Sequence, residues 1–292
     1  MTKILVLGKN GYVSNCFQTY MKQFEDYSVD AISVRDNSWE KIDFSIYDSI
    51  FNTVGLAHND ARKGTDEEFI NLNVNLPVKL ASKAKLDGCK QFIHMSSMIV
   101  YGSLKPLGKN DKYTVDTIPC PNNIYGKSKM MGEQELFKLQ SDYFNVAIIR
   151  SPLIYGEKAI DNFAKLVSYS GKLPIFPNIK NERSMIYSDN LCELVRLIVE
   201  NNSFGLFYPQ QEKYICTSEL VKDIANGLGN KIIITSFFNP VLYMLSGKLG
   251  IVDKVFGTEA YESSMSEQFD GRYRIVSYVE SIKRIISSKK VF

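Results

Sequence analysis

Short apolar runs alternate with longer amphipathic stretches through the first half of the chain. The runs at residues 3–7, 29–34, 49–54, 91–95 and 145–149 predict buried β-strands. Helical patterns lie between them, at residues 12–22, 67–86 and 124–139. Strands that alternate with helices in this way form a parallel sheet covered on both faces. The pattern therefore predicts an α/β fold built on a doubly wound parallel sheet.

The alternation weakens after about Gly156, where glycine, proline and aromatic residues become denser, as in residues 171–177. No stretch of linker-like composition separates the two parts of the chain. We therefore expect a first domain at residues 1–155 and a smaller C-terminal lobe at residues 156–292, packed around one cleft.

A later segment, residues 236–251, is apolar but is interrupted by Asn239, Pro240 and Lys248. No segment reaches the ~18 apolar residues of a membrane span. The first apolar run meets Gly8 too early for a signal peptide. We predict a cytoplasmic protein in which residues 236–251 form a packed or surface helix, with peripheral membrane contact as the alternative.

The charges and cysteines exclude several classes of protein. The 35 basic and 32 acidic residues are scattered without a basic block, which argues against a nucleic-acid partner. The five cysteines are far apart and form no Cys-x-x-Cys pair, so they predict neither a disulfide framework nor a metal site. Because His58 and His94 are the only histidines, a Ser-His-Asp triad is disfavoured as well.

A glycine turn follows the first predicted strand and precedes a helix. Gly8 permits the tight turn, Gly11 lets the backbone approach a diphosphate, and the small Ser14 permits close packing of helix on strand. Backbone N–H groups and the helix dipole favour the diphosphate of a dinucleotide there. A plain strand-to-helix turn is the alternative. The predicted cofactor contacts in this turn are Gly8, Lys9, Asn10, Gly11, Tyr12 and Val13.

The end of the second strand selects between the two nicotinamide cofactors. An acidic residue there binds the ribose hydroxyls of NAD, whereas a basic one accepts the 2′-phosphate of NADP. The strand runs into Arg35 and Asp36, and Lys9 adds a second positive charge nearby. We therefore favour NADP(H) over NAD(H). The alternative is that Arg35 points to solvent and Asp36 binds the ribose.

Three residues form a candidate catalytic group. Tyr125 and Lys129 are four residues apart at the start of a helix and share one of its faces. A nearby ammonium, helped by the positive nicotinamide ring of an oxidised cofactor, lowers the pKa of a tyrosine, which could then exchange a proton with a sugar oxygen. Lys129 can also bind the nicotinamide ribose. Ser97 ends a strand at the edge where a doubly wound sheet binds ligands, and its hydroxyl could bind the same oxygen.

Together these features resemble the extended short-chain dehydrogenase/reductase family, and within it the NAD(P)-dependent nucleotide-sugar epimerases, dehydratases and reductases. The similarity covers nearly the whole chain. It is carried by Gly8-x-x-Gly11-x-x-Ser14, Asn52-Thr-Val-Gly55, Asn73-Val-Asn75, Met95-Ser-Ser97-Met-Ile-Val-Tyr-Gly102, Tyr125-x-x-x-Lys129 and Arg150-Ser-Pro152-Leu-Ile-Tyr-Gly156.

The resemblance implies a Rossmann-type NAD(P)-binding domain at residues 1–155, to which about residues 184–208 return, and a substrate-binding domain at 156–292. It makes Ser97, Tyr125 and Lys129 the catalytic residues, with Ser97 and Tyr125 also contacting the substrate. Further cofactor contacts that it implies are Thr53, Val54 and Gly55 at the end of their strand, Asn73 bracing the sheet, Asp43 and Phe44 near the adenine, and Pro152 by the nicotinamide.

The resemblance also suggests substrate contacts in the second lobe. Arg183 is expected to bind the diphosphate of a UDP-sugar, and Asn162 matches an asparagine that reaches the same group. The alternatives are a surface ion pair for Arg183 and a helix cap for Asn162. The expected partner is thus a nucleotide sugar, and the chain is compatible with a homodimer.

Three functions remain open. The first is an NADPH-dependent reductase of a UDP-linked 4-keto sugar in surface-polysaccharide precursor synthesis, which Arg35 and Lys9 favour. The second is a UDP-hexose 4-epimerase that retains NAD. The third is a non-enzymatic dinucleotide sensor, against which the complete Ser97, Tyr125 and Lys129 set argues. Met98 and Ile99 stand beside the serine, where the dehydratases carry an acid, so dehydration is disfavoured.

Overall fold

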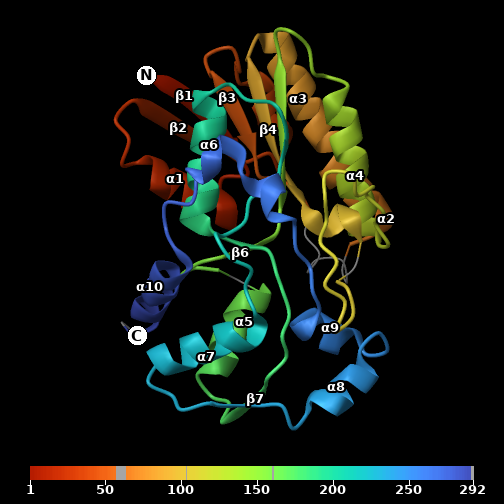
Figure 1. Cartoon of the computed structure of the whole chain (residues 1–292). Helices are drawn as coiled ribbons and strands as arrows, with labels where there is room; N and C mark the ends of the chain where they lie inside the picture. The colour runs from red at the N-terminus through yellow and green to blue at the C-terminus, as the bar shows by residue number, and fades with distance from the viewer. Residues whose placement is uncertain (57–63, 103, 160, 291–292) are drawn as a thin grey trace.

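The computed structural model describes residues 1–56, 64–102, 104–159 and 161–290. His58 and the side chain of Asn162, both named above, lie outside the described part. The chain forms a larger lobe built on a central sheet and a smaller lobe below it in the view of Figure 1.

The central sheet has six strands, all parallel, in the order β2-β1-β3-β4-β5-β9. This confirms the predicted doubly wound α/β fold. Because β1 lies between β2 and β3, the order reverses there, and this reversal is where such sheets bind ligands. The strands are β1 (Thr2–Leu7), β2 (Tyr27–Ile32), β3 (Ser49–Asn52), β4 (Gln91–Ser97), β5 (Asn145–Ser151) and β9 (Gly205–Phe207).

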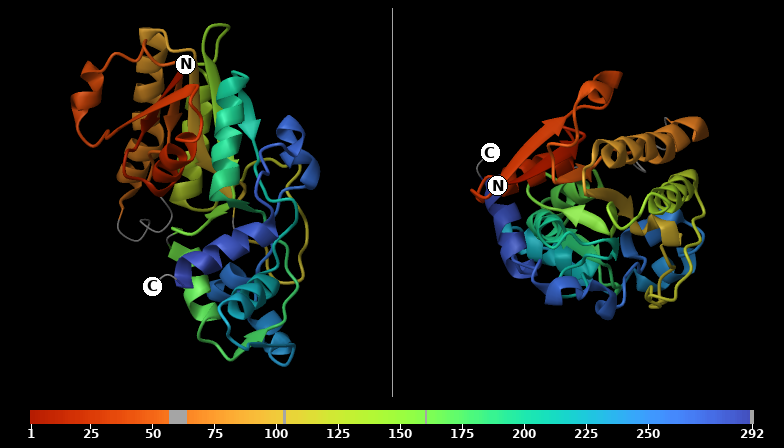
Figure 2. Two further views of the ribbon diagram at one scale, coloured as in Figure 1. Left: turned by 90° about the vertical axis from the view of Figure 1, so that its left-hand side faces the viewer. Right: turned by 90° about the horizontal axis from the view of Figure 1, so that it is seen from above.

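Helices cover both faces of the sheet because the strands are apolar on both sides (Figures 1 and 2). On β1, Ile4 and Val6 pack with residues of α1 and α6, whereas Leu5 and Leu7 pack with residues of α3 and α4. Successive side chains of a strand point to opposite faces, which gives each layer its own core. These helices are α1 (Tyr12–Met21), α3 (Leu76–Asp87), α4 (Ile124–Phe137) and α6 (Ser188–Glu200).

Two predicted elements differ in detail from the structure. The helix predicted at residues 67–86 is α2 (Asp66–Ile70), a π-helical turn η3 (Asn71–Asn75) and α3 in succession. The second strand ends at Ile32 rather than at residue 34. Both differences arise in the larger lobe near the predicted cofactor site, and π-helical turns are frequent at functional sites.

The smaller lobe packs helices around its own apolar cluster, which includes Tyr155, Phe163, Tyr187, Leu220 and Ile282. Two pairs of short parallel strands, β6 with β8 and β7 with β10, complete it. Its elements are β6 (Leu153–Tyr155), α5 (Asp161–Ser170), β7 (Ile175–Pro177), β8 (Met185–Tyr187), α7 (Thr217–Gly227), β10 (Ile233–Thr235), α8 (Asn239–Leu245), α9 (Gly250–Phe256) and α10 (Tyr278–Lys290).

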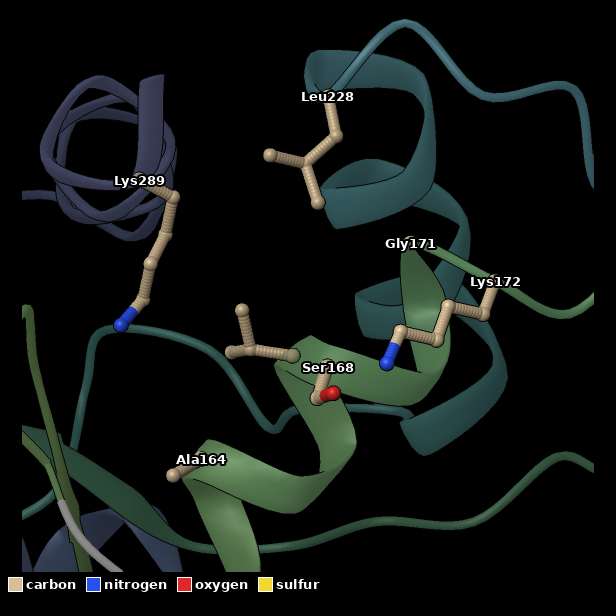
Figure 3. Close-up of a pocket in the computed structure, with 7 residues that line it drawn as sticks. Ala164, Ser168, Gly171, Lys172, Leu228 and Lys289 are labelled. Carbon is tan, nitrogen blue, oxygen red and sulfur yellow. The ribbon is translucent and has the colours of Figure 1, made fainter. Parts of the chain in front are cut away.

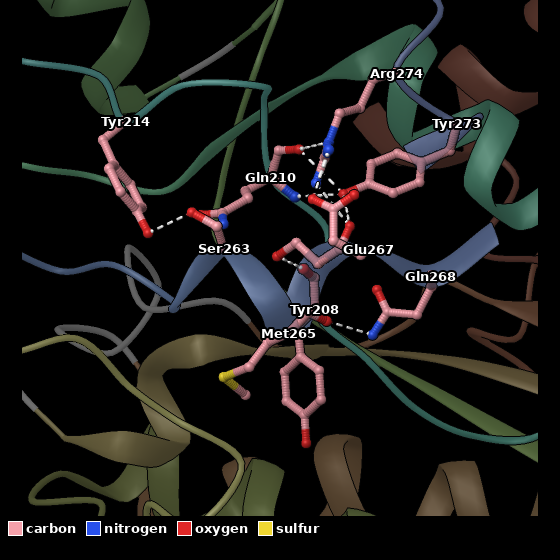
Figure 4. Close-up of polar contacts among 10 residues, drawn as sticks. Tyr208, Gln210, Tyr214, Ser263, Met265, Glu267, Gln268, Tyr273 and Arg274 are labelled. Carbon is pink, nitrogen blue, oxygen red and sulfur yellow. Dashed lines mark hydrogen bonds and ion pairs between the residues drawn. The ribbon is translucent and has the colours of Figure 1, made fainter. Parts of the chain in front are cut away.

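Two later segments lie with the larger lobe. The segment around residues 184–208 begins with β8, which pairs with β6 in the smaller lobe, and continues with α6 and β9, which lie with the larger lobe. β9 extends the central sheet beside β5. Further on, Tyr273 is fully buried in the same core as α1 and α6. Its hydroxyl oxygen lies 2.9 Å from the carbonyl oxygen of Ser266 and 3.1 Å from that of Gln210, and its proton can be donated to either. Arg274 donates to the same two carbonyls and to Glu267 (Figure 4). The two lobes are thus joined by several chain crossings.

The prediction of a single helix at residues 236–251 is wrong. The segment forms α8, which ends at Leu245, and the start of α9, which begins at Gly250. The chain between them includes Gly247 with a φ of 75°, a left-handed conformation that favours glycine and interrupts a helix. In the part of the chain that the structure describes, no helix is long and apolar enough to cross a membrane.

Candidate active site

The glycine turn joins β1 to α1 at the reversal of the strand order. Gly8 has a φ of 101°, and a Cβ atom there would lie 2.8 Å from Thr53 Oγ1. Gly11 caps the N-terminus of α1, and Ser14 is fully buried behind it. The backbone of the turn is therefore held close to the neighbouring strand end, an approach that a side chain at residue 8 would disturb.

The remaining residues of the turn lie next to the two glycines. Lys9 and Asn10 are exposed between the two glycines, and Tyr12 and Val13 form the first turn of α1. The first N–H groups of a helix have no acceptor within it and favour an anion. These features fit the diphosphate of a dinucleotide.

The end of β3 forms the next part of the site. Thr53 donates from Oγ1 to the carbonyl of Leu7, which ties β3 to β1. Val54 and Gly55 follow, and a Cβ atom on Gly55 would lie 2.7 Å from Lys129 Nζ and 2.8 Å from Asn73 Oδ1. A larger side chain at Gly55 would have to displace these hydrogen-bonded groups. The structure thus brings together three predicted residues from separate elements.

Asn73 holds this part of the backbone in place. It is fully buried in the π-helical turn η3, where its Oδ1 accepts from the N–H of Leu56 at 2.9 Å. Its Nδ2 donates to the carbonyl of Leu56 and to Ser128 Oγ, at 3.2 and 3.0 Å. The asparagine therefore links the loop after β3 to α4, the helix that carries Tyr125 and Lys129.

The three candidate catalytic residues meet at the carboxyl end of β4. Ser97 is the last residue of β4, and Tyr125 lies in the first turn of α4, whose cap is Asn123. The hydroxyls of Ser97 and Tyr125 share a side-chain hydrogen bond. Lys129 donates from Nζ to the carbonyl of Met95 at 2.9 Å, one turn further along α4. The strand and the helix thus present all three residues to one edge of the sheet.

Burial determines how these groups titrate. It raises the pKa of the Tyr125 hydroxyl above its usual value, and the hydrogen bond with Ser97 acts in the opposite direction. The lowered pKa predicted from the sequence depends on the positive nicotinamide ring of a bound oxidised cofactor as well as on Lys129. In the protein by itself desolvation penalises the phenolate, and the pKa is raised. Burial also lowers the pKa of Lys129 to about 8, although the charge of Glu133 raises it. At neutral pH Tyr125 is a proton donor and Lys129 is a cation.

A buried polar group behind Lys129 was not predicted. Glu133 lies one turn further along α4, where its carboxylate accepts from Ser96 Oγ and forms an ion pair with Arg150 at 2.7 Å. Arg150 also donates to the Tyr101 hydroxyl at 2.7 Å. The i, i+4 spacing of Lys129 and Glu133 was a usable signal. The sequence contained no signal for the pairing of Glu133 with Arg150, because Arg150 comes from a distant element, β5.

The cofactor-selecting residues lie after β2. The carbonyl of Ile32 accepts from the N–H groups of Gly8 and Lys9, so the glycine turn adjoins the end of this strand. Arg35 is exposed three residues later. The carboxylate of Asp36 is used as a helix cap and accepts from the N–H and hydroxyl of Ser38, at 3.0 and 2.5 Å. Of Arg35 and Asp36, only Asp36 caps the helix that follows.

The other predicted cofactor contacts differ in exposure. Asp43 is exposed, and its carboxylate accepts from the N–H of Ser45. The side chain of Phe44 is fully buried in the core, so only its backbone could face an adenine. Pro152 is buried between β5 and β6, directly after the last residue of β5.

The predicted substrate contacts lie in the smaller lobe. Arg183 donates to the carbonyl of Lys254 at 3.0 Å and faces Glu259 at 3.9 Å, with only 15% of its side chain exposed. The ion pair of the alternative is therefore present, with Glu259, although both side chains are mostly covered. Burial lowers the pKa of Arg183 and raises that of Glu259, while each charge acts against the shift of the other. Asn162 lies in the first turn of α5.

A cavity of about 300 Å³ lies elsewhere, between α5, α7 and α10 (Figure 3). Lys172 and Lys289 reach toward it from opposite sides, and Leu228 closes its apolar wall. None of the predicted site residues lines it. A second cavity of about 300 Å³ is lined by residues that include Glu133 and Arg150, so it adjoins the buried ion pair behind Lys129.

The parallel sheet, the glycine turn and the Ser97, Tyr125 and Lys129 group define a Rossmann-type protein of the short-chain dehydrogenase/reductase class. A family model described as the NAD dependent epimerase/dehydratase family matches residues 4–207. The chain belongs to this family.

Curated relatives match at low identity. A low-salt glycan biosynthesis protein of Haloferax volcanii is 23% identical over 237 residues, which cover 70% of this chain and 75% of that protein. An uncharacterized protein of Sinorhizobium fredii is 27% identical over 184 residues, which cover 59% of this chain. This chain therefore spans only 50% of the length of the Sinorhizobium fredii protein.

Solved structures show the same fold over nearly the whole chain. RMD of Pseudomonas aeruginosa, complexed with NADPH, has a TM-score of 0.77 at 14% identity, with 98% of this chain and 99% of that chain covered. A dTDP-4-dehydrorhamnose reductase of Clostridium acetobutylicum scores 0.73 at 16% identity, with 99% and 100% covered. UDP-glucuronic acid 4-epimerase of Bacillus cereus, with UDP-glucuronic acid and NAD, scores 0.73 at 17% identity, with 100% of both chains covered.

Proposed function

We propose that the protein is an NADPH-dependent reductase of a UDP-linked 4-keto sugar that serves surface-polysaccharide precursor synthesis in the cytoplasm. The observation that carries the reaction type is the hydrogen bond between Ser97 and Tyr125 at the end of β4, with Lys129 on the same helix face. A bound nicotinamide supplies the hydride in such a reaction. The protein's own groups have to bind the sugar oxygen and supply its proton.

Tyr125 is suited to the role of general acid. Because burial raises its pKa, the hydroxyl is protonated at neutral pH and can donate to the oxygen of a ketone as that ketone is reduced. Ser97 Oγ binds the same oxygen and stabilises the negative charge that develops on it. Lys129 is positively charged below about pH 8. Its charge favours a contact with the ribose and stabilises the phenolate that Tyr125 becomes when it donates its proton.

The cofactor preference rests on Arg35 and Lys9. Asp36, the acid that would favour NAD, is engaged in capping η1 (Asn37–Lys41), whereas Arg35 is exposed beside the glycine turn. A guanidinium forms paired hydrogen bonds with a phosphate, and the 2′-phosphate is what distinguishes NADP from NAD.

A UDP-hexose 4-epimerase with retained NAD is the second candidate. The observation in its favour is the fold shared with UDP-glucuronic acid 4-epimerase over the full length of both chains. Epimerisation requires Tyr125 to accept a proton first, which its raised pKa opposes in the protein by itself. A non-enzymatic sensor is less well supported, since it has no use for an acid/base pair.

The purified protein tests these candidates directly. We expect oxidation of NADPH in the presence of a UDP-linked 4-keto sugar, faster than oxidation of NADH. Tyr125→Phe should lower kcat by roughly 10²–10⁴-fold while cofactor binding persists. Tyr143→Phe is the matched control, because Tyr143 is 88% exposed. Tightly bound NAD together with interconversion of UDP-hexoses would instead identify an epimerase.

A further inference from the structure

The end of the smaller lobe carries an exposed apolar surface that the proposed reaction does not use. It is formed by β10, α8 and the start of α9, and α8 lies at the end of the molecule farthest from the central sheet (Figures 1 and 2). None of the residues of α8 is buried. We call this surface the apolar face; its large exposed residues are Ile233, Phe237, Phe238, Val241, Tyr243, Met244, Leu249 and Ile251.

The exposure of these side chains is large for a folded protein. Phe237 is 81% exposed, Ile251 65% and Met244 62%. The rings of Phe237 and Phe238 meet edge to face, with centroids 5.3 Å apart, so they form one apolar unit. Single exposed apolar residues are common, but eight of them within residues 233–251 indicate a binding surface.

Side chains on the inward side of the same segment attach it to the lobe. Leu242 and Leu245 pack against a small core that contains Val252 and Phe256. Polar contacts complete the attachment: Asn239 donates to the carbonyl of Asn178, and Ser246 accepts from the N–H of Leu107. The outward apolar side chains are therefore not needed to fold the lobe, and a helix that is apolar on all sides is expected to be covered on all of them.

The charges around the apolar face are positive. The sequence has no acidic residue between Asp223 and Asp253, a stretch that includes Lys231 and Lys248. Lys109 lies beside the face as well, since its neighbour Gly108 adjoins the Tyr243 ring.

The nearby acids do not offset these charges. The carboxylate of Asp253 is directed inward, toward Ser246 Oγ and the N–H of Gly247. Asp111 is exposed but lies 3.8 Å from Lys105 Nζ. Within the described residues, Lys109, Lys231 and Lys248 form no ion pair. The net charge of this surface is therefore positive.

We propose that the apolar face binds the surface of a bilayer that contains anionic phospholipid. Apolar side chains enter the boundary between headgroups and acyl chains, while lysines at the rim contact the phosphates. A second copy of the chain is a poorer occupant, because a two-fold interface would bring together two surfaces that are both positively charged. The proposal does not depend on the reaction that the active site performs.

Sedimentation with vesicles tests the proposal on the full chain. We use phosphatidylcholine vesicles and vesicles of an equimolar mixture of phosphatidylcholine and phosphatidylglycerol. The wild type should bind the mixed vesicles more tightly, and added salt should weaken the difference. In the double variant Phe237→Ser and Met244→Ser, binding should fall roughly tenfold or more. The matched control, Leu86→Ser with Phe204→Ser, removes exposed apolar residues from the other lobe and should bind like the wild type.

A charge variant tests the contribution of the lysines to vesicle binding without removing any apolar side chain. Lys248→Glu should reduce binding to the mixed vesicles toward the level seen with phosphatidylcholine, whereas Lys90→Glu should not. Equal binding to both vesicle types, or equal binding by the apolar-face and control variants, would overturn the proposal. Analytical ultracentrifugation supplies the remaining outcome: a dimer that dissociates only in the Phe237→Ser and Met244→Ser variant would show that a second copy covers this surface.

Discussion

Replacement of Glu133 by glutamine tests the buried ion pair behind the candidate active site. The Glu133 carboxylate accepts from Arg150 Nε at 3.0 and 3.2 Å and from a terminal guanidinium nitrogen at 2.7 Å. Only 2% of the Glu133 side chain and 9% of the Arg150 side chain are exposed. Burial disfavours the charged guanidinium, but the hydrogen bonds and negative charge of Glu133 outweigh it and raise the pKa of Arg150.

The size of the effect follows from what remains after the substitution. Arg150 stays charged and buried, with the Tyr101 hydroxyl as its other hydrogen-bond partner among the described side chains. Removing one member of a buried ion pair costs about 3–5 kcal/mol. At roughly 2–3 °C per kcal/mol for a protein of this size, the melting temperature should fall by roughly 6–15 °C.

Urea unfolding and thermal melts measure this cost. Glu135→Gln is the matched control, since it makes the same change on the same helix in an exposed pair with Lys138 and should cost less than about 1 kcal/mol. The double variant Glu133→Gln and Arg150→Met removes both charges and should be more stable than Glu133→Gln alone. If Glu133→Gln is no more destabilising than Glu135→Gln, the ion pair does not have the role we assign to it.

Three further predictions concern the cofactor and the substrate. Arg35→Ala should weaken NADP(H) by about 1.5–3 kcal/mol and NAD(H) much less, measured by titration of each; equal losses would favour the NAD-retaining epimerase. Arg183→Ala should raise the KM for a UDP-sugar more than it lowers kcat, and Arg183→Lys should restore little UDP binding in calorimetry, because lysine lacks the planar fork. Unchanged UDP binding would leave Arg183 a purely structural role. The Lys129 cation is lost as pH rises through about 8, so kcat/KM should fall there, and Glu133→Gln should move that fall to lower pH; a profile that does not move would contradict the coupling.

Local patterns in the sequence determined the framework of the fold. The apolar runs became β1 to β5 with end shifts of one or two residues. The central strands β1 and β3 are buried on both faces and therefore have to be largely apolar. The spacing of Tyr125 and Lys129 set them on one helix face, and Gly8 marked the tight turn. These features depend on the residues next to them in the chain, so the sequence was sufficient to predict them.

Tertiary structure decided the properties that depend on burial and on distant partners. Tyr125 has a raised pKa because the packing of the folded chain removes water from its hydroxyl, which neighbouring residues in the sequence do not reveal. Glu133 meets Arg150 because α4 lies against β5, and the buried side chain of Phe44 reflects the packing of the core. The outward side of residues 236–251 was likewise decided by tertiary structure. An apolar segment can be buried or exposed with the same sequence, and only its position at the end of the smaller lobe left these side chains uncovered.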